Sequence, residues 1–180
     1  MFAKVVATVI VTLAVGAPAW AANEEDQQIF REASRQVLRY SQFTIFDSVS
    51  AQVRDGVVTL TGKVTMPYKG EDIAKRIGRI DGVRQVRNDI SVLPVSMNDD
   101  ELRFRIARAI YGHSSFWSYG AMTNPPIHII VERGRVTLEG VVNNNVERML
   151  ARSIATSSSA FSVTNNLKTD AEAIAELERL

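Results

Sequence analysis

The sequence predicts an α+β protein of two tandem αββαβ domains, each a three-stranded mixed sheet with two helices on one face. Two observations carry this prediction. An eight-residue phrase at 55–62 recurs 78 positions later at 133–140, and an alternating apolar run precedes each copy. Helix-like and strand-like segments then follow in the same order around both copies. The repeat is therefore a whole domain, too long and with too few copies for a solenoid.

Each copy of the phrase predicts a β-hairpin. Alternating apolar and polar residues have the period of a half-buried strand, and a dipeptide such as Asp55-Gly56 between two such runs indicates a two-residue turn. That turn pairs Val53 with Val58, and the same rule applies around 133–134. This register puts every apolar residue of both hairpins on one face, whereas a slip of one residue would turn one set outward. Five glycines are assigned to structural turns: Gly56, Gly62, Gly82, Gly134 and Gly140.

Residues 1–21 have the pattern of a secretory signal peptide. Lys4 precedes an apolar run of eleven residues at 5–15, and Ala19-Trp20-Ala21 fits a small-x-small cleavage site. The run is shorter than the roughly 20 apolar residues that a membrane span needs. We therefore expect export, with an uncleaved anchor as the alternative. Because the chain has no cysteine, we expect no disulfide, no lipid anchor on cysteine, and a periplasmic location.

The first domain is expected over residues 24–95. Its first helix, at about 26–40, has an apolar side of Ile29, Ala33 and Val37 and an opposite side of Arg31, Arg35 and Arg39. The arginines form either a solvated face or an anion-binding surface. A second helix at about 71–79 and a strand at 83–93 follow the hairpin. Such a strand–helix–strand passage is normally a right-handed crossover, with both helices on one face of the sheet.

The second domain is expected over residues 96–169. Asn98 or Asp99 is expected to cap a helix whose apolar residues lie 73 positions after those of the first helix. The second hairpin spans 127–142, and a last strand at 163–167 ends the domain. From the helix between them, the residues expected to point inward are Val146, Leu150, Ala151 and Ile154.

Residues 170–180 predict a short C-terminal helical tail. Thr169 and Glu172 have the spacing of a capping box, and Ile174, Leu177 and Leu180 share one side of the helix. This helix either docks on the body of the protein or contacts a second copy or a partner.

The second copy has five extra residues between its first helix and its hairpin. They fall in 111–120, where four aromatic residues lie within nine positions among glycines and serines, and we expect a loop. Trp and Tyr favour membrane interfaces, since one end of each is apolar and the other hydrogen-bonds. With the arginines of the adjoining helix, the candidate lipid- or partner-binding residues are Phe116, Trp117, Tyr119, Arg103, Arg105 and Arg108. The alternative is that Phe116 and Trp117 fold back over the core or fill the joint between domains.

The sequence lacks the patterns of an enzyme or a metal site. Neither His113 nor His128 has a second ligand at the spacing that metals require. Ser114 and Ser115 beside His113 make no nucleophile elbow, and no phosphate-cradling glycine loop is present. Loss of Lys4 with the leader leaves 20 basic and 20 acidic residues, since the whole chain has 21 and 20, which argues against nucleic-acid binding. We expect no catalysis, cofactor, metal or small-molecule substrate.

Both copies resemble the BON domain, named for bacterial osmotically induced (OsmY-type) and nodulation proteins. In the first copy the resemblance rests on 55–62, Ile73-Ala74, Asp81-Gly82-Val83 and the alternation at 86–90. In the second copy it rests on 134–140 and 163–167, so that it covers nearly all of the chain after the leader. The resemblance implies a non-catalytic envelope module, thought to bind phospholipid and to support membrane integrity under osmotic and other stress. It assigns no ligand residues.

Two functions follow as hypotheses. The first is peripheral binding to anionic phospholipid membranes through the aromatic segment. The second is a periplasmic adaptor or chaperone-like module that binds another envelope protein by an open sheet edge or by the C-terminal helix. The lipid, the protein partner and the oligomeric state stay open.

Overall fold

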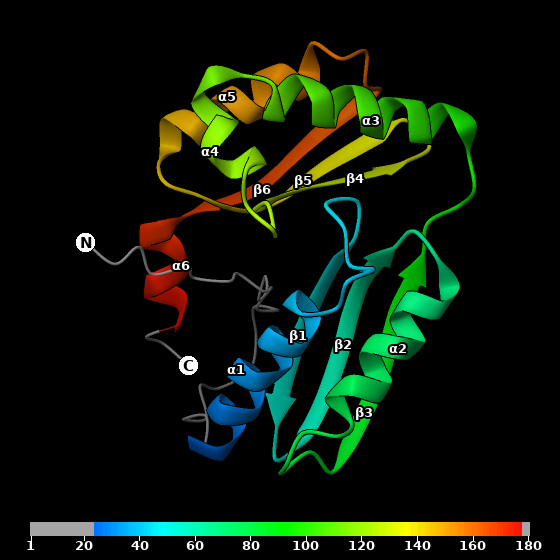
Figure 1. Ribbon diagram of the computed structural model, residues 1–180, viewed down its shortest axis with the longest axis vertical. Helices are drawn as coiled ribbons and strands as arrows, with labels where there is room; N and C mark the ends of the chain where they lie inside the picture. Colours follow the sequence, from blue (N-terminus) through cyan, green and yellow to red (C-terminus); the bar gives the residue numbers. More distant parts are fainter. Residues whose placement is uncertain (1–23, 178–180) are drawn as a thin grey trace.

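The computed structural model describes residues 24–177 and shows two sheets, each covered on one face by helices (Figure 1). The predicted signal peptide and residues 178–180 of the predicted tail lie outside the described residues. The elements of the first domain are α1 (Glu24–Leu38), β1 (Ser48–Arg54), β2 (Val57–Val64), α2 (Pro67–Ile77) and β3 (Gln85–Val92). Those of the second are α3 (Met97–Tyr111), the 3-10 turn η1 (Ser114–Phe116), α4 (Trp117–Gly120), β4 (Ile127–Glu132), β5 (Arg135–Val142), α5 (Asn145–Thr156) and β6 (Ser162–Thr169), and the C-terminal helix α6 (Asp170–Leu177) follows.

Both sheets have the predicted topology. The middle strand, β2 or β5, pairs antiparallel with the strand before it and parallel with the strand after its crossover helix. The hairpin register is also the predicted one, with Val53 opposite Val58 and Val131 opposite Val136. The two residues of each hairpin turn have positive φ, between 50° and 74°, as a type I′ turn requires. The predicted αββαβ fold class is confirmed.

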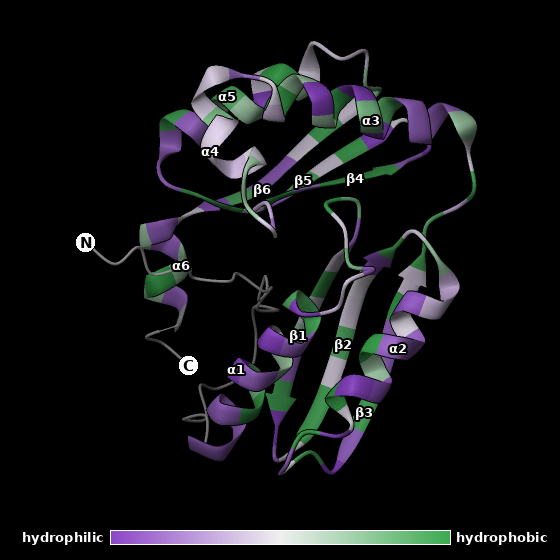
Figure 2. Cartoon of the chain, viewed as in Figure 1, coloured by the Kyte–Doolittle hydropathy of each residue, from purple (hydrophilic) through white to green (hydrophobic). Residues whose placement is uncertain are grey.

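Each domain has its own core between its sheet and its helices. In the first, Ile29 and Val37 of α1 and Ile73 of α2 lie over the apolar face of the hairpin. The second core has the same plan, but β4 is more apolar than its counterpart β1 and is buried on both faces. Figure 2 shows this strand as almost continuously hydrophobic. The face of β4 that points away from its own core is buried by contact with the first domain.

One aspartate in each domain binds the first helix to the hairpin turn. Asp26 of α1 accepts the backbone N–H groups of Asp55 and Gly56, at 2.8 and 2.9 Å. Asp99 of α3 accepts those of residues 133 and 134, at 2.7 and 2.8 Å. The expected capping role of Asn98 or Asp99 is therefore wrong: the N-cap is Ser96, whose hydroxyl accepts the N–H of Asp99. Asp99 turns its own carboxylate to the hairpin instead.

Two of the five glycines assigned to turns lie within strands. Gly62 in β2 and Gly140 in β5 have φ of 130° and 124°, and both face the first residues of the preceding strand. A Cβ on Gly140 would lie 1.8 Å from the carbonyl oxygen of Pro126, and one on Gly62 would lie 2.1 Å from that of Ser48. These glycines allow the neighbouring strand to approach closely. The other three, Gly56, Gly82 and Gly134, occupy turns as predicted.

The inward face predicted for α5 is wrong at one position. Val146 is exposed, whereas Ala151 and Ala155 are fully buried. The residues of α2 and α5 align at an offset of 78, because the side-chain amides of Asn88 and Asn165 donate to the carbonyls of residues 70 and 148 respectively. Ile73 and Ile77 thus correspond to the two alanines.

The C-terminal helix docks on the second domain. The predicted capping box is confirmed, with Thr169 N–H donating to Glu172 at 2.8 Å and Glu172 N–H donating to the Thr169 hydroxyl at 3.3 Å. Glu172 also pairs with Arg148 of α5 at 2.8 Å. Ala173 of this helix is buried, and Ile174, expected on its apolar side, is half exposed.

Replacing Asp26 or Asp99 with alanine is expected to lower the free energy of unfolding by about 2–4 kcal/mol. Each substitution removes two charge-assisted hydrogen bonds and leaves two turn N–H groups without their acceptor. Urea titration followed by circular dichroism measures the change. Asp89→Ala is the matched control, because Asp89 is exposed on the outer face of β3. An equal loss in the control would contradict a specific role for the two clamps.

Candidate functional site

The predicted aromatic loop is folded, and its aromatic residues take opposite sides. Residues 114–120 form the 3-10 turn η1 and the short helix α4. Phe116 is 0% and Tyr119 5% exposed, both within the core of the second domain, whereas Trp117 is 76% exposed. Phe116 and Tyr119 were wrongly assigned to a binding surface; for Phe116, the alternative of packing on the core is confirmed. Trp117 alone of the three presents its ring to solvent.

Tyr119 fastens the inserted segment to α5. Its hydroxyl donates to the Glu147 carboxylate at 2.6 Å and accepts the N–H of Asn143 at 2.9 Å. Burial, and then the hydrogen bond to Glu147, raise the pKa of Tyr119, so the phenol stays protonated as this donor. Since Trp117 is two residues before Tyr119 and Val146 is next to Glu147, this bond brings two exposed apolar residues from different helices to one end of the helix layer.

The three arginines predicted for lipid binding have different surroundings. Arg103 is 4% exposed, pairs with Asp100 and donates from Nη2 to the Val131 carbonyl at 2.6 Å, so its assignment to a lipid surface is wrong. Arg105 is exposed and pairs with Glu101 at 3.1 Å. Arg108 is exposed, and its side chain makes no hydrogen bond or ion pair within residues 24–177.

Arg103 belongs to a set of groups that cover the free edge of β4. The Tyr111 hydroxyl donates to the Ile127 carbonyl at 2.5 Å and accepts the Ile127 N–H at 3.2 Å. One step along the strand, the N–H of Ile129 donates to the carbonyl of Ile45 in the first domain at 2.7 Å. Two residues further along the strand, Arg103 donates to the carbonyl of Val131. An uncovered strand edge invites pairing with another chain, and these contacts occupy that of β4.

Five of the exposed large apolar residues lie on the helices of the second domain: Met97, Phe104, Trp117, Val146 and Met149. We use the name apolar patch for Trp117 of α4 with Val146 and Met149 of α5, which are 76%, 76% and 65% exposed. Val146 and Met149 are three residues apart and so share one side of α5. Phe104 of α3 is also exposed, although one edge of its ring contacts Phe46. Sequence reasoning missed Val146 and Met149; the offset of 78 between α2 and α5 would have placed Val146 outside.

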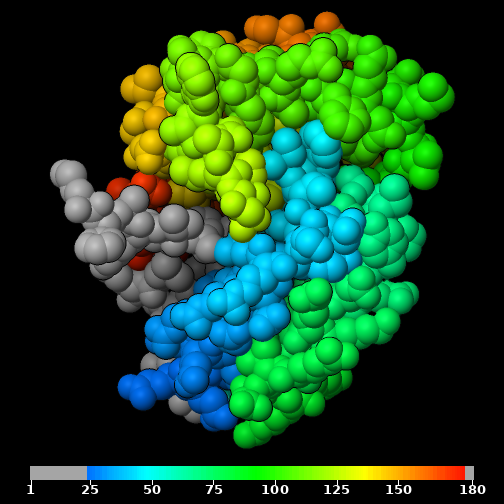
Figure 3. All heavy atoms as spheres, viewed as in Figure 1, coloured from blue at the N-terminus to red at the C-terminus, as the bar shows by residue number. Residues whose placement is uncertain are grey.

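The loop that follows α1, residues 40–47, packs against the second domain. The Phe46 ring contacts Phe104 edge-on, at 5.1 Å between centroids, and the Phe43 ring lies 5.3 Å from that of His128. Asn124 adds a hydrogen bond to the carbonyl of Leu38 at 3.2 Å. In Figure 3 this loop, in cyan, lies directly against the yellow-green segment that contains α4. The first domain therefore contacts β4 through this loop, and Lys63 of β2 adds a pair with Glu132 at the end of the strand.

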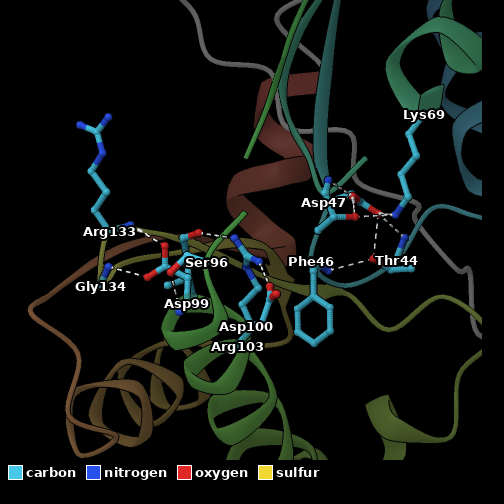
Figure 4. A network of polar contacts seen from close by, with 12 residues as sticks. Thr44, Phe46, Asp47, Lys69, Ser96, Asp99, Asp100, Arg103, Arg133 and Gly134 are labelled. Carbon is cyan, nitrogen blue, oxygen red and sulfur yellow. Dashed lines mark hydrogen bonds and ion pairs between the residues drawn. The ribbon is translucent and has the colours of Figure 1, made fainter. Parts of the chain in front are cut away.

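A buried carboxylate shapes that loop (Figure 4). Asp47, 0% exposed, accepts five hydrogen bonds of 2.7–2.9 Å. The donors are the N–H and hydroxyl of Thr44, the N–H and hydroxyl of Thr65, and the Lys69 ammonium. Burial by itself would raise the pKa of Asp47, but these donors outweigh it and hold the pKa below its usual range. Asp47 is therefore ionised and fully paired.

His128 is the titratable group at the junction. Its Nδ1 is buried and has no hydrogen-bond partner among the described residues, while its ring packs against Phe43. Burial lowers the pKa of His128, although the backbone of Asp47 and Thr44 and the charge of Glu139 act in the opposite direction. The imidazole is neutral at pH 7, and its prediction as a residue pointing away from its own core is correct.

Two hollows lie on the surface of the described residues. One, of about 890 Å³, lies between the domains and is lined by residues of β1, β2, β4, β5 and β6. Two polar pairs cross it, Lys63 with Glu132 and Ser48 with Glu139. The other, also about 890 Å³, lies between α1 and α2. Within residues 24–177 no group of three or more His, Asp or Glu residues is arranged to hold a metal ion. Over the same residues, no helix is long and apolar enough to cross a membrane.

Two αββαβ modules that meet at a shared junction define a tandem-domain protein. A family model for the BON domain matches residues 26–94 and again residues 98–171. The chain belongs to the BON-domain family and carries two tandem copies. Membership of this family points to an envelope-associated protein.

Two solved structures of CdsD, a structural protein of the type III secretion system of Chlamydia trachomatis, are similar to this chain. One, of the C-terminal domain, is 14% identical with a TM-score of 0.32, covering 79% of this chain and 65% of that one. The other is 15% identical with a TM-score of 0.31, covering 85% and 68%. The chain thus spans about two thirds of their length, and likeness at this level carries no argument. No curated protein matches the chain.

The stability of the protein is expected to fall below about pH 6.5 because of His128. The folded pKa is lowered, so above the unfolded value of about 6.5 both states are neutral and the contribution is fully present. Below pH 6.5 the unfolded chain binds a proton at His128 that the folded chain does not bind, and this favours unfolding. The loss from one proton is limited to about 1.4 kcal/mol per pH unit. Urea titrations of the wild type and His128→Gln between pH 7.5 and 5 measure it, and parallel pH profiles would contradict it.

Proposed function

We propose that this protein binds anionic phospholipid membranes peripherally through the apolar patch, without catalysis, and so supports the bacterial envelope. The observation that carries the proposal is the exposure of Trp117 of α4 and of Val146 and Met149 of α5, on a helix layer whose core-facing side is well packed. Exposed large apolar groups that share one end of a fold are typical of interaction surfaces. A tryptophan among them favours the boundary between lipid headgroups and chains.

The energy available fits reversible attachment. A buried aromatic side chain removes roughly 150–250 Å² from water, which at about 25 cal/mol per Å² gives roughly 4–6 kcal/mol when burial is complete. Trp117 already has a quarter of its surface covered, and immobilisation opposes binding. Val146 and Met149 add apolar area. The sum supports weak, reversible binding rather than insertion.

Charge gives the preference for anionic lipid. Arg108 of α3 is exposed without a partner in the described chain, and Arg105 is exposed with its guanidinium shared with Glu101. A basic residue close to an anionic membrane contributes about 1 kcal/mol and is screened by salt. Binding is therefore expected to weaken as ionic strength rises.

The proposed setting is the periplasm. The expected leader and the absence of cysteine support export of a chain without disulfides. BON domains are in general non-catalytic, which agrees with a binding role. The alternative function, an adaptor for another envelope protein, would use a sheet edge such as that of β3, because contacts from Tyr111, Ile45 and Arg103 occupy the edge of β4.

Trp117 provides its own test, because the chain from Ala22 onward contains no other tryptophan. Adding phosphatidylglycerol vesicles to this chain is expected to shift the tryptophan emission to shorter wavelength, as the indole leaves water. Trp117→Ala is expected to weaken co-sedimentation with the vesicles by about tenfold or more, equivalent to about 1.4 kcal/mol. Phosphatidylcholine vesicles and higher salt are expected to reduce binding.

Phe161→Ala is the matched control, because Phe161 is 78% exposed but borders the hollow between the domains. Its removal is expected to leave vesicle binding within twofold of the wild type. Failure of the chain to bind anionic vesicles, an unshifted emission spectrum, or equal losses in both variants would contradict membrane binding. The adaptor function would then be the better account.

A further inference from the structure

The groove between α1 and α2 of the first domain has an unusual surplus of unpaired cations. Its wall includes five basic side chains, Arg31, Arg35, Lys75, Arg76 and Arg79. It includes three acidic side chains, Glu32, Asp72 and Asp81. The groove lies on the helix layer of the first domain, on elements remote in the sequence from the apolar patch (Figure 1).

Two of the three carboxylates are already occupied. Glu32 accepts hydrogen bonds from Arg35 and Gln36, both at 3.0 Å, and the bonds from Gln36 and then Arg35 lower its pKa. Asp72 accepts the hydroxyl of Tyr40 at 2.9 Å. A hydrogen bond from a phenol does not cancel the charge of a carboxylate, so the wall of the groove, with five basic and three acidic side chains, has a formal surplus of two positive charges.

Three guanidinium groups keep their donors free. The side chains of Arg31, Arg76 and Arg79 make no hydrogen bond or ion pair within residues 24–177. Arg76 lies over the Tyr40 ring, 4.9 Å from guanidinium carbon to centroid, in a cation–π contact. The helix dipole accounts for Lys75 and Arg76 in the last turn of α2 but not for Arg31, in the middle of α1.

The fold does not require these arginines, as the second domain shows. Asp26 and Asp99 make the same clamp, so α1 and α3 align at an offset of 73 and Arg31 corresponds to Phe104. At the offset of 78 between α2 and α5, Arg76 and Arg79 correspond to Ile154 and Ser157. The second domain has the same architecture without any of the three guanidinium groups.

From these observations we propose that the groove between α1 and α2 is a binding site for a phosphate-bearing anion. A guanidinium presents five N–H donors in a planar fork that matches phosphate oxygens, and such pairs add geometry to charge. Three free guanidinium groups, one from α1, one from α2 and one from the turn after α2, surround a hollow of about 890 Å³ and suit a ligand with more than one phosphate group. The site is separate from the apolar patch and does not depend on membrane binding there. The phosphate comes either from a lipid headgroup or from a soluble phosphorylated compound.

Calorimetric titration of the chain from Ala22 with sodium pyrophosphate at low salt tests the site. One saturable site is expected, and the double variant R31Q/R79Q is expected to bind at least tenfold more weakly. Its matched control is R54Q/R87Q, which removes the same charge from the sheet face opposite the helices. The control is expected to bind within twofold of the wild type. No binding by the wild type, or equal weakening in both double variants, would overturn the proposal and leave a solvated basic face.

Vesicles separate the two sources of phosphate. If R31Q/R79Q also loses binding to phosphatidylglycerol vesicles beyond the loss in R54Q/R87Q, the groove takes a lipid headgroup. If vesicle binding falls only as much as in the control, the groove takes a soluble phosphorylated ligand. The pyrophosphate result stands or falls independently of Trp117, so failure of this site and failure of the apolar patch are distinguishable. Circular dichroism confirms that each variant is folded.

Discussion

The arrangement of the whole molecule depends on one buried charge. Asp47 has no exposed surface and accepts five hydrogen bonds, so the loop of residues 40–47 has one conformation in which all of them are satisfied (Figure 4). That conformation carries Phe43 and Phe46 against the second domain and directs the Ile45 carbonyl at the edge of β4. Burying an ionised carboxylate is unfavourable unless every lone pair is used. The requirement to pair Asp47 thus orders the loop, and the loop sets the second domain on the first.

The two copies satisfy the same backbone N–H group at the end of the middle strand, but the equivalent position of the crossover helix is a lysine in one and a glutamate in the other. At the end of β2 the N–H of Thr65 donates to Asp47, with Lys69 of α2 as the counter-charge. At the end of β5 the corresponding N–H, that of Asn143, donates to the Tyr119 hydroxyl and to Glu147, which holds the position of Lys69 at the offset of 78. The five-residue insertion is what delivers Tyr119. It replaces a loop aspartate by a phenol, and in doing so turns Trp117 to the surface.

The sequence was sufficient for the scaffold because strand register is a local property. Alternation and a turn dipeptide decide which face each residue of 49–64 and 127–142 takes, and the structure agrees residue by residue. It was insufficient where a side chain acts on a distant backbone group. Arg103 and Asp99 satisfy N–H and carbonyl groups more than 25 residues away, and their charges alone suggested a surface and a cap. The helical turns at 114–120 depend on Tyr119 reaching Glu147, a contact that no local pattern announces. The spacing of 73 between Asp26 and Asp99 was a usable signal, since it equals that of the apolar residues on the same helices.

The junction also decides which surfaces are left for function. The outer face of the second sheet is turned toward the first domain, and the pairs Ser48 with Glu139 and Lys63 with Glu132 connect the two. The helix α6 lies on the same side of this sheet, opposite α3 and α5 (Figure 1). What remains open to partners is mainly the two helix layers, and these have diverged although their cores have not. One presents free guanidinium groups between its helices, and the other presents tryptophan, valine and methionine. Duplication of a single fold, followed by exchange of the residues that the fold does not use, is enough to place a charged and an apolar recognition surface on one chain. Because both cores are closed by the same clamps, each surface is free to change without cost to the other.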